Sequence, residues 1–194
     1  MSANQGNPTR DDEVCGGLVR LRPVREEDLP QIVAWENDPE TTRFSGGPLG
    51  TTVEGERRRL LAHPDGGEPT AWAIETRDDG RLIGVIGLHS LHRRHHRARV
   101  FAIIGSIADR GKGFGTDALR CLLHHAFTRG GWHRLSMRVL PENQAILRSA
   151  EKCGFEREGV SREAWFVDGR FHDDIRLAIL EPDWRGPLSN GGGE

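Results

Sequence analysis

The sequence contains no tyrosine, only three cysteines and no long apolar run in its 194 residues. The cysteines, Cys15, Cys121 and Cys153, are odd in number and lack the spacing of metal ligands, so they fit a reducing compartment better than a disulfide framework. The N-terminal segment has no apolar stretch of the kind found in secretion signals or membrane spans. We therefore expect a cytoplasmic protein with no membrane association and no metal site.

Lysine is also scarce, because Lys112 and Lys152 are the only lysines among 27 basic residues. The net charge of −2 provides no field that would attract nucleic acid, so none is expected as a partner. An apolar content of 36% is typical of a globular chain, and we place one domain at residues 17–185. Residues 1–16 and 186–194 are rich in glycine, asparagine, serine and charge, and we expect disordered tails there.

Hydrophobic periodicity and turn residues predict an α+β fold. Strands are expected at 18–23, 70–76, 81–88, 98–105, 134–140, 156–167 and 170–180, the last two joined by a turn at Asp168-Gly169. Helices are expected at 26–37, 53–63, 114–128 and 143–153. Early antiparallel strands followed by the order β-α-β-α-β-β indicate a mixed sheet flanked by helices.

A glycine-rich turn joins an apolar strand to a helix at residues 103–116. Backbone N–H groups at the start of a helix bind phosphate, and glycines let a phosphate approach them closely. A nucleoside-triphosphate loop has four residues between its glycines and then Lys and Ser or Thr, whereas five residues separate Gly105 from Gly111 and Gly113 follows Lys112. A dinucleotide site needs an acidic residue about 20 positions later, where His133-Arg134 stand instead.

The stretch Arg110-Gly111-Lys112-Gly113-Phe114-Gly115 resembles the acetyl-CoA pyrophosphate loop of the GNAT N-acetyltransferases. Segments 132–139, 143–155 and 168–173 follow in the order typical of the RimJ/RimL-like branch. The resemblance covers about residues 17–185. It implies a mostly antiparallel central sheet with a splayed strand pair that holds the CoA, and transfer of an acetyl group from acetyl-CoA to an amine. It leaves a homodimer open.

The resemblance also implies the donor side of the site. Backbone groups from Gly111 to Thr116 are expected to bind the pyrophosphate, and the end of the preceding strand to pair with the pantetheine amides. Asn143 matches an asparagine that binds pantetheine in the family, and it equally fits a helix N-cap. The residues expected to bind acetyl-CoA are Ile103, Ile104, Gly105, Arg110, Gly111, Lys112, Gly113, Phe114, Gly115, Thr116, Asn143 and Lys152, of which Lys152 also fits plain solvation.

The reaction needs two proton transfers. An alkyl amine has a pKa near 10.4, so its neutral form costs about 4–5 kcal/mol at pH 7 and a base must assist. Glu163 is the first candidate base and His172 the second. Many relatives protonate the departing thiolate with a tyrosine, but Ala150 stands at that position, which leaves Ser149 or water. Arg99 stands where relatives often carry a catalytic glutamate.

The acceptor side carries weaker signals. The resemblance points to the first helix and the loop after it, to a strand end, and to the last hairpin; the candidates are Trp35, Glu36, Asp38, Phe44, His89, Ser90 and Asp173. The acceptor stays open among a protein α-amine, a polyamine and another small amine. Two alternatives also stay open, namely a different donor such as succinyl-CoA and a non-catalytic module that binds acyl-CoA.

Overall fold

The computed structural model describes residues 14–44, 50–61, 69–167 and 169–186. Its helices are α1 (Leu29–Asn37), α2 (Pro39–Thr42), α3 (Val53–Glu56), α4 (Phe114–Thr128) and α5 (Gln144–Lys152). Short helical turns are η2 (Glu26–Asp28), the π-helical η3 (Arg57–Leu61), η5 (Arg93–His95), η6 (Ile107–Asp109) and η7 (Glu181–Asp183). Its strands are β1 (Val14–Cys15), β2 (Val19–Pro23), β3 (Ala71–Thr76), β4 (Leu82–His92), β5 (Arg97–Ile104), β6 (Arg134–Val139), β7 (Glu156–Val167) and β8 (Arg170–Leu180). Residues 1–13 and 187–194 of the tails expected at 1–16 and 186–194, the expected helix end at 62–63, and Asp168 lie outside the described residues.

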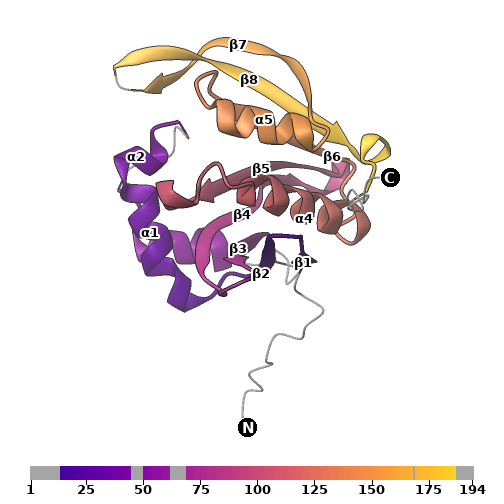
Figure 1. Cartoon of the computed structure of the whole chain (residues 1–194). Coiled ribbons are helices and arrows are strands. Elements are labelled where there is room, and N and C mark those ends of the chain that lie inside the picture. The colour runs from indigo at the N-terminus through magenta and orange to yellow at the C-terminus, as the bar shows by residue number, and fades with distance from the viewer. Residues whose placement is uncertain (1–13, 45–49, 62–68, 168, 187–194) are drawn as a thin grey trace.

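The strands form one mixed sheet in the order β1-β2-β3-β4-β5-β6-β8-β7. Neighbouring strands are antiparallel except for β5 and β6, which are parallel and are connected through α4. Figure 1 shows β7, β8 and α5 at one side of the molecule and β2 to β5 with α1 at the other. The α+β fold expected from the sequence is confirmed.

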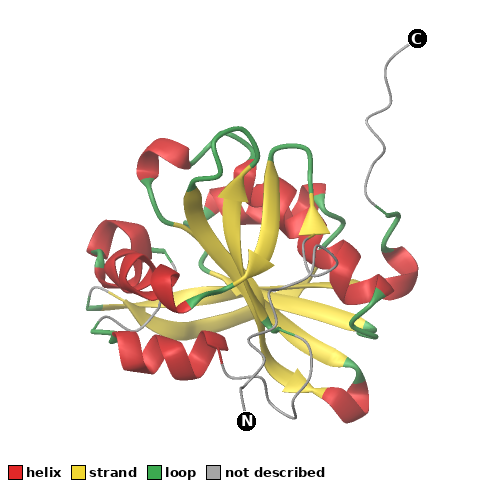
Figure 2. Cartoon of the chain, turned by 90° about the horizontal axis from the view of Figure 1, so that it is seen from below, coloured by secondary structure: helices red, strands yellow, loops and turns green. Residues whose placement is uncertain are grey.

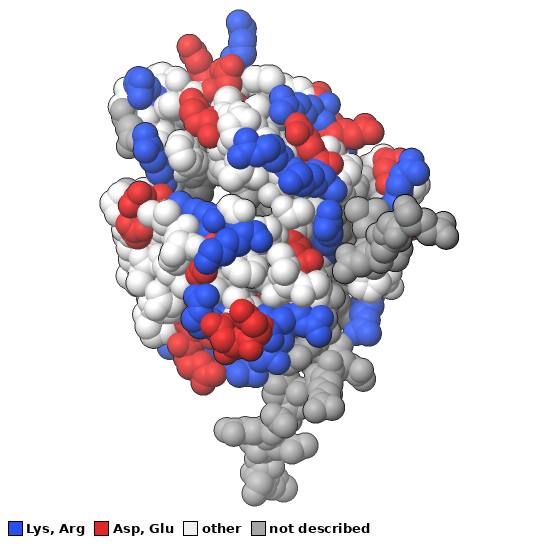
Figure 3. Space-filling model, in the orientation of Figure 1, with Lys and Arg blue, Asp and Glu red and all other residues white. Residues whose placement is uncertain are grey.

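The alternation of side chains along the strands creates two hydrophobic cores, one on each face of the sheet. Trp72 and Ile74 of β3 pack with α4 and α5, whereas their neighbours Ala71 and Ala73 pack with α1 and η3. Helices accordingly cover both faces (Figure 2). Acidic and basic side chains are interspersed over the face drawn in Figure 3, in keeping with the small net charge.

Most element bounds match the expectations, and α4 matches at both ends. Its apolar residues recur at helical spacing, and Leu119, Leu122 and Leu123 are buried in the first core. Two ends differ. β4 extends to His92 because backbone pairing with Arg97 continues past the apolar stretch. The sheet also begins at Val14, ahead of the boundary expected at residue 17, since β1 pairs with β2. No helix within the described ranges is long and apolar enough to span a membrane.

Candidate active site

A cavity of about 550 Å³ opens where β5 and β6 diverge. The two strands pair only from Arg97–Arg134 to Arg99–Ser136, although β5 continues to Ile104 and β6 to Val139, all of them described residues. Beyond Arg99 the backbone groups of β5 that face β6 form no hydrogen bonds to that strand. A buried peptide group needs a hydrogen-bond partner, and here another molecule could supply it. An extended ligand that carries amide groups therefore fits this gap, as an added strand would.

One end of the cavity meets the glycine-rich loop. Gly111 and Gly113 have φ angles of 77° and 91°, which favour glycine, and Gly113 is the N-cap residue of α4. The Arg110 guanidinium donates to the carbonyl oxygen of Ile104 at 3.3 Å and so ties the loop to β5. Gly115 lines the cavity. The exposed N–H groups at the start of α4 thus lie beside the strand gap, in a position suited to a phosphate group.

Lys112 of this loop is held by a buried carboxylate. The Asp109 side chain is buried, with the residue 4% exposed. Its Oδ1 lies 3.6 Å from Lys112 Nζ, and its Oδ2 lies 3.1 Å from Arg81 Nη1. The hydrogen bond from Arg81 lowers the pKa of Asp109, with Lys112 adding a smaller effect. Arg81 Nε also pairs with Asp79 Oδ2 at 3.0 Å, so the group holds two positive and two negative charges and adds no net charge next to the loop.

Gly105 leaves room for the ring of Trp35, and a larger residue would collide with it. A Cβ atom there would lie 2.0 Å from Cε2 of Trp35, so the indole ring of α1 packs directly on the backbone where β5 ends. Trp35 does not line the cavity. Its expected contact with the acceptor is therefore unsupported, and its ring instead fixes α1 against β5.

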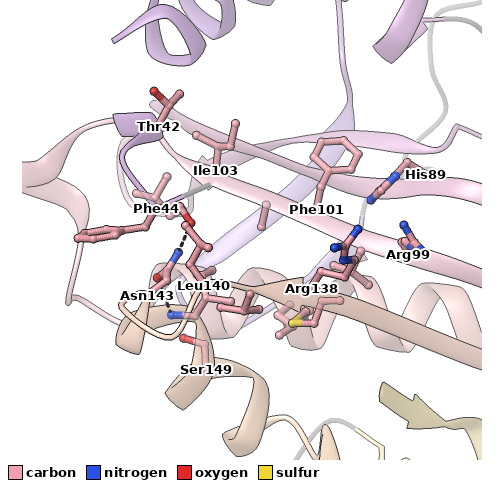
Figure 4. Close-up of a pocket in the computed structure, with 18 of the residues that line it drawn as sticks. Thr42, Phe44, His89, Arg99, Phe101, Ile103, Arg138, Leu140, Asn143 and Ser149 are labelled. Atoms are coloured by element: carbon pink, nitrogen blue, oxygen red, sulfur yellow. Dashed lines mark hydrogen bonds between the residues drawn. The ribbon is translucent and has the colours of Figure 1, made fainter. Parts of the chain in front are cut away.

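Helix α5 supplies polar groups on the same side of the cavity (Figure 4). Asn143 Oδ1 accepts from the Ile146 N–H at 3.2 Å, so Asn143 caps the helix, and its Nδ2 donates to the Phe44 carbonyl oxygen at 3.4 Å. The Ser149 hydroxyl also lines the cavity and accepts from Thr116 Oγ1 at 2.9 Å. Lys152 is exposed at the end of the helix and does not line the cavity.

The other end of the cavity carries two buried carboxylates around one arginine. Glu36 of α1 and Glu56 of α3 are 7% and 2% exposed, and both line the cavity. Arg59 donates to Glu56 at 2.8 Å and forms an ion pair with Glu36, and its guanidinium lies 5.0 Å from the centre of the Phe101 ring. Burial raises the pKa of Glu36 to about 7; Arg59 opposes this and the negative charge of Glu56 adds to it. Glu36 is therefore a carboxyl group that can exchange a proton near neutral pH.

His89 at the end of β4 lines the same end of the cavity. Partial burial of its ring, and then the positive charges of Arg99 and Arg59, lower the pKa of His89. Its imidazole is therefore neutral at pH 7. Ser90 does not line the cavity; its hydroxyl lies 3.1 Å from His89 Nδ1, and its φ of 50° is unusual for a residue other than glycine.

Several residues expected at the site lie outside the cavity lining. Glu163 is exposed in an irregular part of β7, and its N–H donates to Asp173 Oδ1 at 2.9 Å. His172 Nδ1 lies 3.1 Å from Glu142 Oε1. Asp38 caps α2 by accepting from the N–H groups of Glu40 and Thr41. None of these residues lines the cavity. The geometry therefore gives no support for Glu163 or His172 as the base or for Asp38 and Asp173 as acceptor contacts.

Other cavity residues were missed. Glu56, Arg59, Arg138 and Trp165 line the cavity, and the sequence signals around them are those of an ordinary helix and of ordinary strands. The resemblance assigns Arg99 no role beyond replacing a glutamate, yet it too lines the cavity. Within the described residues, no three His, Cys, Asp or Glu side chains gather as a metal site would require.

Comparison with known proteins assigns the family. Residues 19–156 match the family model of the acetyltransferase (GNAT) domain. The chain is 36% identical over 138 residues to the probable N-acetyltransferase YjcK of Bacillus subtilis (strain 168), covering 68% of this chain and 75% of that protein. It is 29% identical to the spermidine N(1)-acetyltransferase of Escherichia coli (strain K12), covering 84% of this chain and 86% of that protein.

A solved structure gives the same picture. The spermidine N-acetyltransferase from Vibrio cholerae in complex with CoA and spermine superposes with a TM-score of 0.77 and 25% identity, covering 85% of this chain and 96% of that one. The non-catalytic alternative is thereby set aside. The family match and the shared fold show that the chain belongs to the GNAT family of acetyltransferases and is an acetyl-CoA-dependent N-acetyltransferase.

Proposed function

We propose that the chain transfers the acetyl group directly to a primary amine while acetyl-CoA and the amine are bound together. One observation carries this proposal: a single cavity has Asn143 and Ser149 at the end near the phosphate loop and Glu36 and His89 at the other. The donor would enter along the diverging strands with its pyrophosphate at the start of α4. The amine would enter from the side of α1 and α3. The two reactants would then meet beside β5 without a covalent enzyme intermediate.

The chemistry balances without a protein nucleophile. The amine nitrogen attacks the thioester carbonyl carbon, an N–C bond forms, and the C–S bond breaks to release the CoA thiolate. The bound ammonium group must first lose a proton to become a nucleophile. After the attack, the new amide nitrogen loses a second proton and the thiolate gains one. The protein therefore contributes orientation, a proton acceptor on the amine side and a proton donor on the sulfur side.

Glu36 is our candidate for the proton acceptor. It lines the cavity, whereas Glu163 and His172 do not, and its pKa of about 7 keeps a large fraction of the carboxylate available at neutral pH. A positively charged amine would also replace part of the charge that Arg59 now supplies to Glu36. His89, as a neutral imidazole beside the same space, is suited to hydrogen-bond the amine.

Ser149 is our candidate for the proton donor. Its oxygen accepts a hydrogen bond from the Thr116 hydroxyl, so its own O–H can donate to another group. Its side chain also lines the cavity. Ala150, at the position where relatives carry tyrosine, is fully buried in the core and cannot take this role. A serine–threonine pair would thus replace the missing tyrosine.

Thiol release from acetyl-CoA, measured against a panel of primary amines, tests the proposal. Glu36→Gln should lower kcat/KM at least tenfold with little change in the KM for acetyl-CoA, whereas the exposed Glu27→Gln should behave like the wild type. Wild-type rates in Glu36→Gln would remove Glu36 from the mechanism. A second arm with succinyl-CoA tests the donor, because the loop would bind the phosphates of either acyl-CoA and not its acyl group.

The finer family branch is also a proposal. The order of the four motifs between residues 110 and 173 supports the RimJ/RimL-like branch. A complex of CoA and spermine in the Vibrio cholerae enzyme supports amine acceptors in general. The choice among α-amines, polyamines and other small amines depends on the charges at the acceptor end.

A further inference from the structure

Three arginines line the acceptor end of the cavity, and their partners differ. Arg59 is paired with Glu36 and Glu56. Arg138 Nε lies 2.5 Å from Oδ2 of Asp174, which is fully buried. Arg99 has no carboxylate within ion-pair distance anywhere in the part of the chain that the structure describes. The two carboxylates that line the cavity, Glu36 and Glu56, are already engaged by Arg59.

Arg99 lies at the acceptor end of the cavity (Figure 4), away from the loop expected to bind the donor phosphates. It lies opposite His89 in the β4–β5 ladder, so both side chains project from the same face of the sheet. Figure 4 shows Arg99, Arg138 and His89 together at the end of the cavity away from Asn143 and Ser149. The phosphate loop follows Ile104, five residues further along β5, which corresponds to about 17 Å of extended chain.

A polyamine does not fit these charges. Every nitrogen of a polyamine is cationic near pH 7, so each needs an acidic partner, yet the described lining provides no carboxylate without an arginine already bound. An acceptor with one amine and one acidic group fits better. Its amine would face Glu36 and His89, and its anion would face Arg99, whose planar guanidinium binds a carboxylate or phosphate through two parallel hydrogen bonds.

We propose that the acceptor is an amine that also carries a carboxylate or phosphate group, and that Arg99 binds this group. The proposal rests on the proposed function and defines its substrate class. Arg99 would thus determine specificity in place of the glutamate that relatives often carry there. Because the anion balances the charge of Arg99 and the amine approaches Glu36, the acceptor would be fixed at two points.

Matched pairs of acceptors test the proposal in the thiol-release assay. Lysine and cadaverine differ only by the carboxylate, as do ornithine and putrescine; phosphoethanolamine and ethanolamine differ only by the phosphate. We expect kcat/KM to be at least tenfold higher for the acidic member of the preferred pair, and the pairs distinguish the two anions. Equal or faster turnover of cadaverine, putrescine and spermidine would overturn the proposal.

Variants make the test specific to Arg99. Arg99→Gln should raise the KM for the acidic acceptor about tenfold or more, as expected for the loss of a charged hydrogen bond, and should not raise the KM for acetyl-CoA or for the matched amine that lacks the anion. Arg97→Gln is the control, because Arg97 lies two residues away on the same strand face and does not line the cavity. An unchanged KM in Arg99→Gln would contradict the assignment.

A binding measurement separates this proposal from the proposed function. If no amine is acetylated although calorimetry shows acetyl-CoA binding, the proposed transfer fails. Calorimetric titration of lysine and of cadaverine into the CoA complex then still decides the substrate class. Tighter binding of lysine that is lost in Arg99→Gln supports it, and equal binding overturns it.

Discussion

The contact between Gly105 and Trp35 yields a quantitative prediction. In Gly105→Ala the new Cβ would lie 2.0 Å from Cε2 and 2.1 Å from Cδ2 of the indole. Since carbon atoms normally approach to about 3.5 Å, the ring or the strand must move by roughly 1.5 Å. Gly105 lacks a positive φ, so alanine causes no backbone strain there and the clash is the main effect. Such overpacking costs about 1–3 kcal/mol.

Thermal unfolding measures this effect. For a domain of this size each kcal/mol lowers the Tm by about 2–4 °C, so we expect a fall of roughly 2–12 °C. Gly17→Ala is the matched control, because no atom lies within 4 Å of the added Cβ. A double-mutant cycle with Trp35→Leu should abolish most of the cost, since the smaller side chain leaves room for the methyl group. An unchanged Tm in Gly105→Ala, or an equal loss in both backgrounds, would refute the reasoning.

Three further predictions follow from the site. The carboxylate form of Glu36 is the active one, so kcat/KM should rise with pH through about 7, and Glu36→Gln should abolish that limb of the pH–rate profile; a limb that persists would argue against Glu36. Ser149→Ala should lower kcat about tenfold or more with little change in the KM for acetyl-CoA, in the range typical of acid–base groups, and wild-type turnover would leave the proton transfer to water. Asp117 accepts from the N–H groups of Gly17, Leu18 and Val19 at 3.2, 2.7 and 3.0 Å, so Asp117→Ala should destabilise the fold by about 1–3 kcal/mol; chemical denaturation with an unchanged midpoint would contradict this.

Local patterns in the sequence are sufficient for most of the fold. Apolar residues at helical spacing place α4 correctly, and alternating or continuous apolar runs place β3, β5, β6 and the last hairpin. The loop after Gly105 could be related to a phosphate because its chemistry depends on consecutive backbone groups next to a helix start. Such features involve neighbouring residues only, and a sequence displays them directly.

The acceptor side could not be read in the same way. Glu36, Glu56 and Arg59 belong to separate helical segments, and Arg99 and Arg138 lie on different strands. The strand pattern favours Glu163 as the base, but whether its side chain reaches the cavity depends on the irregular pairing between Ser161 and Trp165. An irregularity of this kind redirects side chains, and no local residue pattern announces it.

The sequence by itself determined the order of the main elements, the glycine-rich turn between β5 and α4 and the resemblance to the family, because each depends on short-range spacing. Only the tertiary structure decided that β5 and β6 separate after Arg99, that Trp35 occupies the space above Gly105, and that Glu36 shares Arg59 with Glu56. These features depend on which side chains meet across the sheet and on how much water remains around them. Burial then changes the pKa of Glu36 and leaves Arg99 as a cation facing the cavity, and both are properties of the packed molecule.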